Sequence, residues 1–188
     1  GGSYAPALGG PRKRSANVVY CRQYFPDPLL AETFNQGSTL LETDAVRLWS
    51  LGGDVGILSF KTKLNTVSAG VLEGIHQAID HAERHLGGLV LWQTAEPFSA
   101  GADLSGAIEA LKAGQVAPFE AMVARFQQTS MRIKYSLVPV VAAVRGMALG
   151  GGCEFQMHSA KTVAALESYI GLVEAGVGLL PAGGGLKE

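Results

Sequence analysis

Cysteine and charged residues are both scarce in this sequence. The 188 residues include two cysteines, Cys21 and Cys153, too few for the disulfide framework of a small secreted domain and typical of a reduced, cytoplasmic protein. Charged residues make up 16% of the chain and the net charge is −1. The sequence therefore lacks the concentrated basic charge that nucleic-acid binding requires. We expect a cytoplasmic location and no nucleic-acid partner.

Long apolar stretches are also missing, although the chain is apolar overall. Hydrophobic residues account for 47% of it and the mean hydropathy is +0.20. The longest apolar runs, such as residues 138–144, are nevertheless far shorter than the roughly 20 residues that span a bilayer. We also expect no signal peptide, because the N-terminal residues contain no apolar core. The composition predicts one globular domain with a substantial core and no membrane partner.

The first 43 residues differ from the rest of the chain. They contain four prolines and the basic run RKR at 12–14, a composition typical of a linker. Three charges in such a segment are usually solvated and do not form a binding patch. We interpret residues 1–43 as a linker or tail, with room for a short helix at 28–35, and residues 44–188 as the folded domain.

From residue 44 onward, short β-type runs alternate with helical patterns. Residues 45–50 and 55–60 flank a turn at 52–54 and predict a hairpin, and apolar residues at helical spacing predict a helix over 71–82. The remaining expected elements are strands at 89–93, 138–144 and 162–166, and helices at 118–135 and from the glycines at 150–152 to about residue 159. Strands that alternate with helices predict an α/β layered fold.

Two glutamates lie 20 residues apart (174 − 154 = 20), each beside a run of glycines. Glu154 closes LGGGCE at 149–154, where three glycines open a predicted helix. Free N–H groups and the helix dipole at such a position favour an oxygen that gains negative charge. Two structural explanations remain open, because close helix–strand packing accounts for the glycines and the dipole alone accounts for the glutamate.

Glu174 lies in an apolar segment, where an isolated charge is harder to explain structurally. Burial there would raise the pKa of its carboxyl, as a general acid requires. A third element, FSAGADL at 98–104, has small residues that let the backbone approach a ligand, and Asp103 is placed to cap the next helix. An ordinary strand-to-helix turn would account for it equally well. Together, the three elements indicate a site that polarises a carbonyl and moves protons beside it.

No other combination of residues in the sequence favours a second kind of catalytic or binding site. His81 and His85 have a spacing that zinc uses, but no HExxH glutamate and no third ligand accompany them, so we interpret them as solvent-facing and expect no metal. No GxSxG elbow accompanies His158, so a Ser–His nucleophile pair is not supported. No GxGxxG motif follows a strand, so a nucleotide-binding site is not supported either. The glycines at 183–185 are interpreted as the next turn.

Three motifs, taken in order, resemble the crotonase superfamily of enoyl-CoA hydratases and isomerases. They are FSAGADL at 98–104, PVVAAVRG at 139–146 running into ALGGGCE at 148–154, and Glu174 with Gly178 and Pro181. The resemblance extends from residue 44 to the end and implies ββα repeats that form a spiral of stacked strands and helices. The chain looks most like the hydratase part of bifunctional 3-hydroxyacyl-CoA dehydrogenase/enoyl-CoA hydratase proteins, which AALESYIGLVE at 164–174 also resembles. Residues 1–43 would then end a preceding dehydrogenase region.

Carried over residue by residue, the resemblance implies a complete acid–base site. The backbone N–H groups of Ala102 and Gly151 would form an oxyanion hole, and Glu154 and Glu174 would hold and split one water. The presence of both acids favours hydration of 2-enoyl-CoA to 3-hydroxyacyl-CoA in fatty-acid β-oxidation over isomerisation. The residues implied to bind the acyl-CoA thioester are Ala100, Asp103, Leu104, Gly150 and Pro181. Hydration would need no cofactor, and NAD is expected only for the dehydrogenase part.

The sequence departs from the family pattern in two places. KTKLN at 61–65 replaces the usual NRP segment, so that only Leu64 and Asn65 resemble the family there. The sequence stops at Glu188, before the further strand and helices that in the family cover the acyl pocket and build a trimer. The resemblance therefore implies an incomplete domain, truncated at its C-terminus, that belongs to a homo-oligomeric family. Two alternatives stay open, an enoyl-CoA isomerase and an inactive acyl-CoA-binding fragment.

Overall fold

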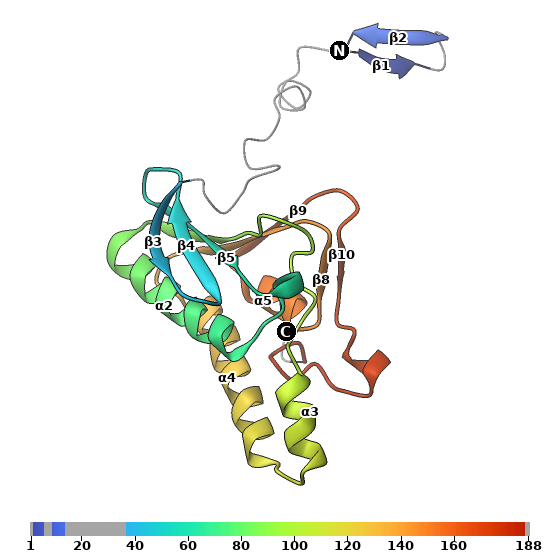
Figure 1. Ribbon diagram of the computed structural model, residues 1–188. Coiled ribbons are helices and arrows are strands. Elements are labelled where there is room, and N and C mark those ends of the chain that lie inside the picture. Colours follow the sequence, from blue (N-terminus) through green and yellow to red (C-terminus); the bar gives the residue numbers. More distant parts are fainter. Residues whose placement is uncertain (1, 6–8, 14–36, 187–188) are drawn as a thin grey trace.

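A mixed sheet organises the computed structural model of this protein, which describes residues 2–5, 9–13 and 37–186. The sheet has six strands in the order β3-β4-β5-β6-β7-β9 (Figure 1). These strands are β3 (Ser38–Glu42), β4 (Val46–Ser50), β5 (Val55–Phe60), β6 (Gly88–Leu91), β7 (Val140–Val144) and β9 (Lys161–Ala164). The first three strands are antiparallel, and those from β5 to β9 run parallel. Near the N-terminus, β1 (Gly2–Ala5) and β2 (Gly10–Lys13) form a separate hairpin.

The predicted hairpin and the helix after it are confirmed. β4 and β5 pair with Val46 opposite Phe60, and α2 (Ala69–His85) follows. The Ser68 hydroxyl caps α2 by accepting a hydrogen bond from the Val71 N–H at 3.3 Å, which satisfies one of the donors that a helix start leaves free. The apolar residues predicted at helical spacing are all buried, and α2 packs on β4, β5 and β6. Two strands and a helix thus form the first ββα unit.

Along the rest of the chain, strands continue to alternate with helical segments. β6 leads to α3 (Ser105–Lys112) and α4 (Ala117–Lys134), β7 leads to β8 (Met147–Leu149) and α5 (Gly151–His158), and β9 leads to β10 (Tyr169–Gly171) and the 3-10 turn η3 (Glu174–Val177). β8 and β10 pair in parallel as a second small sheet. The α/β layered fold predicted from the alternation of strands and helices is confirmed.

Several details differ from the sequence-based expectation. β3 falls inside the range 1–43 that we assigned to a tail, and its pairing with β4 places these residues in the sheet. α3, β8 and β10 were not predicted, and the short helix suggested at 28–35 lies outside the described residues. Within the described ranges, no helix combines the length and the apolar character needed to cross a bilayer.

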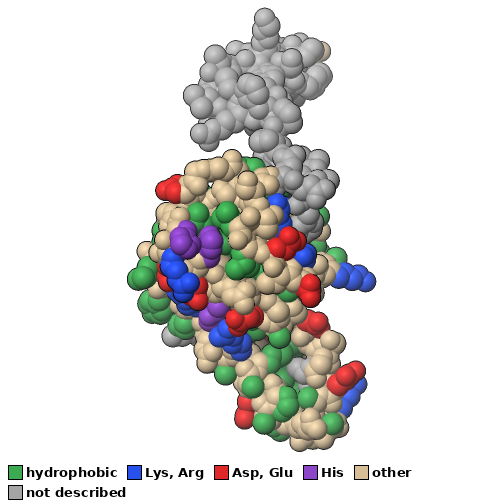
Figure 2. All heavy atoms as spheres, turned by 60° about the vertical axis from the view of Figure 1, so that its left-hand side comes forward, with side chains coloured by type: hydrophobic (Ala, Val, Ile, Leu, Met, Phe, Trp, Pro, Cys, Tyr) green, Lys and Arg blue, Asp and Glu red, His purple; other side chains and the backbone are tan. Residues whose placement is uncertain are grey.

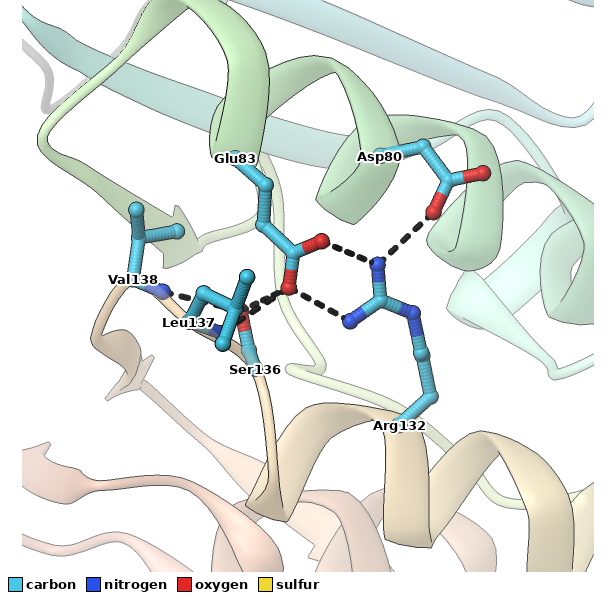
Figure 3. Close-up of polar contacts among 6 residues, drawn as sticks. All are labelled: Asp80, Glu83, Arg132, Ser136, Leu137 and Val138. Carbon is cyan, nitrogen blue, oxygen red and sulfur yellow. Dashed lines mark hydrogen bonds and ion pairs between the residues drawn. The ribbon is translucent and has the colours of Figure 1, made fainter.

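A partly buried ion cluster fixes α4 against α2 (Figure 3). The Arg132 guanidinium donates to both carboxylate oxygens of Glu83, at 2.6 and 2.7 Å, and to Asp80 at 2.7 Å. Glu83 also accepts from the Leu137 N–H at 2.8 Å, so the cluster holds the loop that leads into β7. These hydrogen bonds, chiefly those from Arg132, lower the pKa of Glu83 from its ordinary value of 4.5 to about 2. The cluster thereby positions α4, which forms one wall of the candidate site.

Glu83→Gln is expected to destabilise the fold by about 2 kcal/mol at neutral pH, because it weakens several hydrogen bonds to one charged group. The folded-state pKa of Glu83 lies below its unfolded value, so its contribution is complete above pH 4.5 and is lost as pH falls toward about 2. Urea unfolding at pH 7 and pH 3 measures both effects. The matched control is Glu73→Gln, which breaks the exposed pair with Arg125 and should cost no more than about 0.5 kcal/mol. Equal losses in the two variants would contradict the prediction.

Candidate active site

Two turns that are far apart in the sequence meet at the start of α5. Ser99 and Ala148 form a parallel bridge, in which the Ser99 N–H donates to the Met147 carbonyl and the Leu149 N–H donates to the Ser99 carbonyl, both at 3.0 Å. A Cβ built on Gly101 would lie 3.7 Å from the Gly151 nitrogen. The FSAGADL segment therefore lies directly against the N-terminus of the glycine-led helix.

The loop before Ala102 is held by the 3-10 turn η2 (Lys63–Asn65). The Ser99 hydroxyl donates to the Asn65 carbonyl at 2.7 Å and accepts from the Gly101 N–H at 3.1 Å. The Asn65 side chain in turn donates to the Pro97 carbonyl at 2.7 Å. Asn65 has a φ of +51°, a left-handed conformation that asparagine tolerates better than most residues. Sequence reasoning missed the positioning roles of Asn65 and Ser99; the match of Leu64-Asn65 to the family pattern was the one available signal.

The backbone N–H groups of Ala102 and Gly151, one on each of these turns, donate to no protein acceptor among the described residues. The bridge between Val67 and Ala102 uses the carbonyl of Gly101 and the N–H of Asp103, not the N–H of Ala102. Gly151 is the first residue of α5, where the helix itself supplies no acceptor. Two such donors on adjoining turns have the arrangement that stabilises an oxyanion.

Gly151 also meets a steric requirement. A Cβ at this position would overlap the ring of Phe126 on α4. That ring stacks on Phe155 of α5 with centroids 4.9 Å apart. A glycine therefore lets α4 approach the donor turn closely, so the packing explanation holds for Gly151, and its functional role stays a prediction.

Glu154 lies in the first turn of α5 and is 3% exposed. Its Oε1 accepts a hydrogen bond from the Gly185 N–H at 2.9 Å. Burial raises the pKa of Glu154, and the nearby Glu174 carboxylate raises it further, against the lowering effect of the Gly185 bond. The glycines at 183–185, interpreted from the sequence as a simple turn, therefore hold a carboxylate in place.

Glu174 begins η3 and is half-buried. Its Oε1 lies 3.2 Å from the Cβ position of Gly150, at the start of the same turn that carries Gly151. Its Oε2 is buried, and none of the described residues hydrogen-bonds to it. The sequence led us to expect deep burial at Glu174, but it is Glu154 that is deeply buried, whereas Glu174 is half-buried.

One cavity of about 560 Å³ joins these groups. Of the predicted site residues it is lined by Ala100, Ala102, Leu104, Gly150, Gly151, Glu154 and Glu174. Two predicted substrate-binding residues lie outside it. Asp103 is exposed, and its carboxylate accepts from the Ser105 N–H at the start of α3, so it has the capping role that we weighed against a binding role. Pro181 stands between the lining residues Leu180 and Ala182 but is not itself in the wall.

The opposite wall of the cavity comes from α4, through Phe119, Met122, Val123 and Phe126. The sequence predicted this helix but not the path of residues 105–136, so these lining residues were missed. Each of these residues has another of the four at a distance of three or four positions along the helix, and this spacing was the available signal for one apolar face.

The described residues do not bring three potential metal ligands together anywhere. His81 and His85 lie side by side on α2 with ring centroids 4.8 Å apart. On the face of the molecule that Figure 2 shows, histidine side chains lie near lysines, arginines and acidic residues. Neither histidine lines the cavity that holds the two glutamates.

Comparison with known proteins decides the family. A family model described as enoyl-CoA hydratase/isomerase matches residues 55–187. The chain belongs to the enoyl-CoA hydratase/isomerase family. Solved structures that superpose on this chain, one of them titled an enoyl-CoA hydratase/isomerase, confirm the crotonase-like α/β fold expected from the three motifs. Relatives named as a 3-hydroxyacyl-CoA dehydrogenase and as a trifunctional fatty acid oxidation enzyme confirm the resemblance to that group of proteins.

Three matches illustrate the relationship. A Bacillus subtilis protein named "Probable 3-hydroxyacyl-CoA dehydrogenase" is 40% identical over 154 residues, which cover 82% of this chain and 18% of that protein. A Bacillus subtilis "Probable enoyl-CoA hydratase" is 32% identical over 126 residues, which cover 66% of this chain and 48% of that protein. The solved structure of Pseudomonas aeruginosa DspI superposes with a TM-score of 0.70 at 28% identity, covering 81% of this chain and 62% of that one. The chain thus spans about a fifth of the length of the first relative and about half of the second.

Proposed function

We propose that the cavity binds a 2-enoyl-CoA thioester and adds water across its double bond, giving a 3-hydroxyacyl-CoA in fatty-acid β-oxidation. The observation that carries this proposal is the meeting of two carboxylates and two backbone N–H groups in one apolar cavity. Hydration needs one group to accept a proton from water, one to deliver a proton to carbon, and donors for the charge that gathers on the thioester oxygen.

The proposed mechanism assigns each of these tasks. The thioester oxygen lies between the N–H groups of Ala102 and Gly151. Glu154 takes a proton from water as the water oxygen bonds to C3, and the C2–C3 π electrons move to form an enolate. The enolate collapses as C2 takes a proton from Glu174, so the elements of one water have been added. The two carboxyl groups then exchange a proton through solvent to restore the starting state.

The raised pKa of Glu154 supports its role as base, since a buried carboxylate is a stronger base than an ordinary glutamate. Glu174 Oε2 is buried and accepts no hydrogen bond from the described residues, so its hydrogen-bonding capacity is not used by the fold. The reaction transfers no electrons to an acceptor, so it calls for no redox cofactor, and carboxylates move both protons without a metal. NAD would serve only a linked dehydrogenase part. A cytoplasmic location and a trimeric assembly stay predictions.

Turnover of crotonyl-CoA in water enriched in ¹⁸O tests the proposal. We expect loss of enoyl absorbance and one ¹⁸O atom at C3 of the product, with a rate that EDTA does not change. A product whose double bond has shifted, without incorporated oxygen, would identify an isomerase. CoA-ester binding without any turnover would identify a binding fragment. Either of these results would overturn the proposed hydration.

A further inference from the structure

A turn at residues 182–185 is in contact with the carboxylate of Glu154. The Gly185 N–H donates to Glu154 Oε1 at 2.9 Å, and a Cβ built on Gly183 would overlap Oε2 of the same carboxylate. The chain after η3 thus returns to lie beside α5 (Figure 1). Both oxygens of the proposed base are therefore placed by the backbone of a turn about 30 residues further along the chain.

This turn belongs to no helix or strand, so its position depends on the groups that hold it from outside. Two side chains of α4 do so. The Ser130 hydroxyl donates to the Gly183 carbonyl at 2.6 Å, and the side-chain amide of Gln127 donates to the Ala182 carbonyl at 2.8 Å. Because the two donors are three residues apart, they project from the same side of the helix. α4 thereby binds two successive carbonyls of the turn.

The Ser130 hydroxyl is directed out of its own helix. A serine or threonine inside a helix commonly bonds the carbonyl four residues back, as the neighbouring Thr129 does with the Arg125 carbonyl at 2.8 Å. Ser130 is fully buried and bonds the turn instead. Burying a hydroxyl costs free energy unless it is hydrogen-bonded, so the contact with the turn accounts for a serine at this position.

The turn also fits tightly between α4 and α5. A Cβ at Gly183 would overlap the ring of Phe126 on α4, and a Cβ at Gly184 would lie 2.7 Å from the ring of His158 on α5. Gly184 has a φ of +133°, which favours glycine on backbone grounds as well. His158 is itself bonded to the Glu154 carbonyl at 2.7 Å. A shift of the turn would therefore be transmitted to the first turn of α5.

Resting on the proposed function, we infer that Ser130 and Gln127 are positioning residues for the base of the hydration reaction. Through the turn they hold the Gly185 N–H against Glu154, which fixes the direction in which the free carboxylate oxygen faces the water. Neither Ser130 nor Gln127 lines the cavity. Both therefore act through the turn and not through contact with the substrate.

The groups around Glu154 determine the sign of the expected effect. Burial raises the pKa of Glu154, the Gly185 N–H lowers it, the Glu174 carboxylate raises it and His158 lowers it. Burial also raises the pKa of the adjacent Cys153, which stays an uncharged thiol, and α4 packs an aromatic ring against this region. Releasing the turn weakens the bond from Gly185, so the pKa of Glu154 should rise.

Ser130→Ala removes the donor to Gly183 and should lower kcat for crotonyl-CoA hydration about tenfold with little change in KM, because a misplaced base slows proton transfer without weakening binding. The acid limb of the kcat/KM profile should move to higher pH by about 0.5–1 pH unit, the equivalent of one hydrogen bond. Thr129→Val is the matched control. It removes a buried hydroxyl from the next position of α4, where the contact is with His76 on α2, and should lower Tm without moving the acid limb. The same acid limb in both variants would overturn the inference.

Gln127→Ala tests the second contact at an exposed position, and it decides the question if Ser130→Ala does not fold. It should shift the acid limb in the same direction and lower kcat by about threefold, since an exposed hydrogen bond contributes less. Gln128→Ala is its control, because this neighbouring glutamine is also exposed, while the turn carbonyl is bonded by Gln127. Equal profiles in the two glutamine variants would contradict the positioning role.

A ¹³C NMR titration of the Glu154 carboxyl in the substrate-free chain measures the same pKa without catalysis, with the signal assigned by its loss in Glu154→Gln. A pKa raised in Ser130→Ala and Gln127→Ala would uphold the contact between α4 and Glu154 even if the chain hydrated no enoyl-CoA, in which case only the proposed function would fail. Hydration by the parent together with an unchanged pKa in both variants would keep the function and overturn the inference.

Discussion

Glu154→Gln and Glu174→Gln should each lower kcat for enoyl-CoA hydration by about 10²–10⁴-fold, the range that general acid–base catalysis contributes. Glutamine keeps the size and the hydrogen-bonding oxygen of glutamate but cannot exchange a proton at neutral pH. The two losses should not multiply in the double variant, because both carboxyl groups act on the same water addition. Single-turnover measurements on crotonyl-CoA separate this chemical step from binding. Activity within tenfold of the parent in either variant would remove that residue from the mechanism.

The pH dependence of the parent distinguishes the two glutamates. Glu154 must be ionised to accept a proton, and its pKa is raised by burial and by the neighbouring Glu174 carboxylate. The acid limb of the kcat/KM profile should therefore lie at a higher pH than the ordinary glutamate value of 4.5. A profile that is flat down to pH 4.5 would show that Glu154 does not act as the base.

The free energy of unfolding of Glu154→Gln provides a control for the predicted loss of activity in this variant. A raised folded-state pKa means that the contribution of Glu154 to stability is complete below pH 4.5 and is lost as pH rises through the folded-state value. At pH 8 the buried carboxylate is a cost that glutamine avoids, while its amide oxygen still accepts from Gly185. Glu154→Gln should thus be more stable than the parent by about 0.5–2 kcal/mol, as is common where function opposes stability. Loss of activity together with loss of stability would point to a structural role instead.

Local patterns were sufficient to predict the elements that form the core. The helix α2 and the β4–β5 hairpin follow from apolar spacing and a glycine turn, because each buries its own periodic face. β8 and β10 were missed because each has three residues and finds its partner more than 20 residues away. β3 was missed because it is an edge strand that is largely exposed, with no clear alternation to mark it.

The candidate site shows the same division between local and long-range information. The resemblance indicated the two turns that carry Ala102 and Gly151, but not how they are held together. Asn65 and Ser99 act through contacts across more than 30 residues of sequence, which no local pattern reports. The expectation for Glu174 was reasoned from its apolar neighbours, yet Val173 and Val177 beside it are exposed. Apolar neighbours in sequence do not establish burial, because burial depends on what packs over the segment.

Ala102→Pro should reduce kcat for hydration by about 10²–10³-fold with little change in KM, the loss expected when one oxyanion donor is removed. Proline lacks the N–H, and the hydrogen bonds around this position use the Gly101 carbonyl and the Asp103 N–H instead. The substitution therefore removes a donor that the fold does not use. Ala102→Ser keeps the N–H and serves as the matched control, with activity expected near that of the parent.

The decisive comparison for Ala102 is between the ground state and the transition state. An oxyanion donor contributes most when charge has developed on the thioester oxygen, so Ala102→Pro should still bind a saturated acyl-CoA nearly as well as Ala102→Ser does. A folded Ala102→Pro protein with kcat within tenfold of the control would contradict the assignment of this N–H. If the proline variant does not fold, a backbone ester at position 102 removes the same N–H without adding a ring, and the same loss in kcat is expected from it.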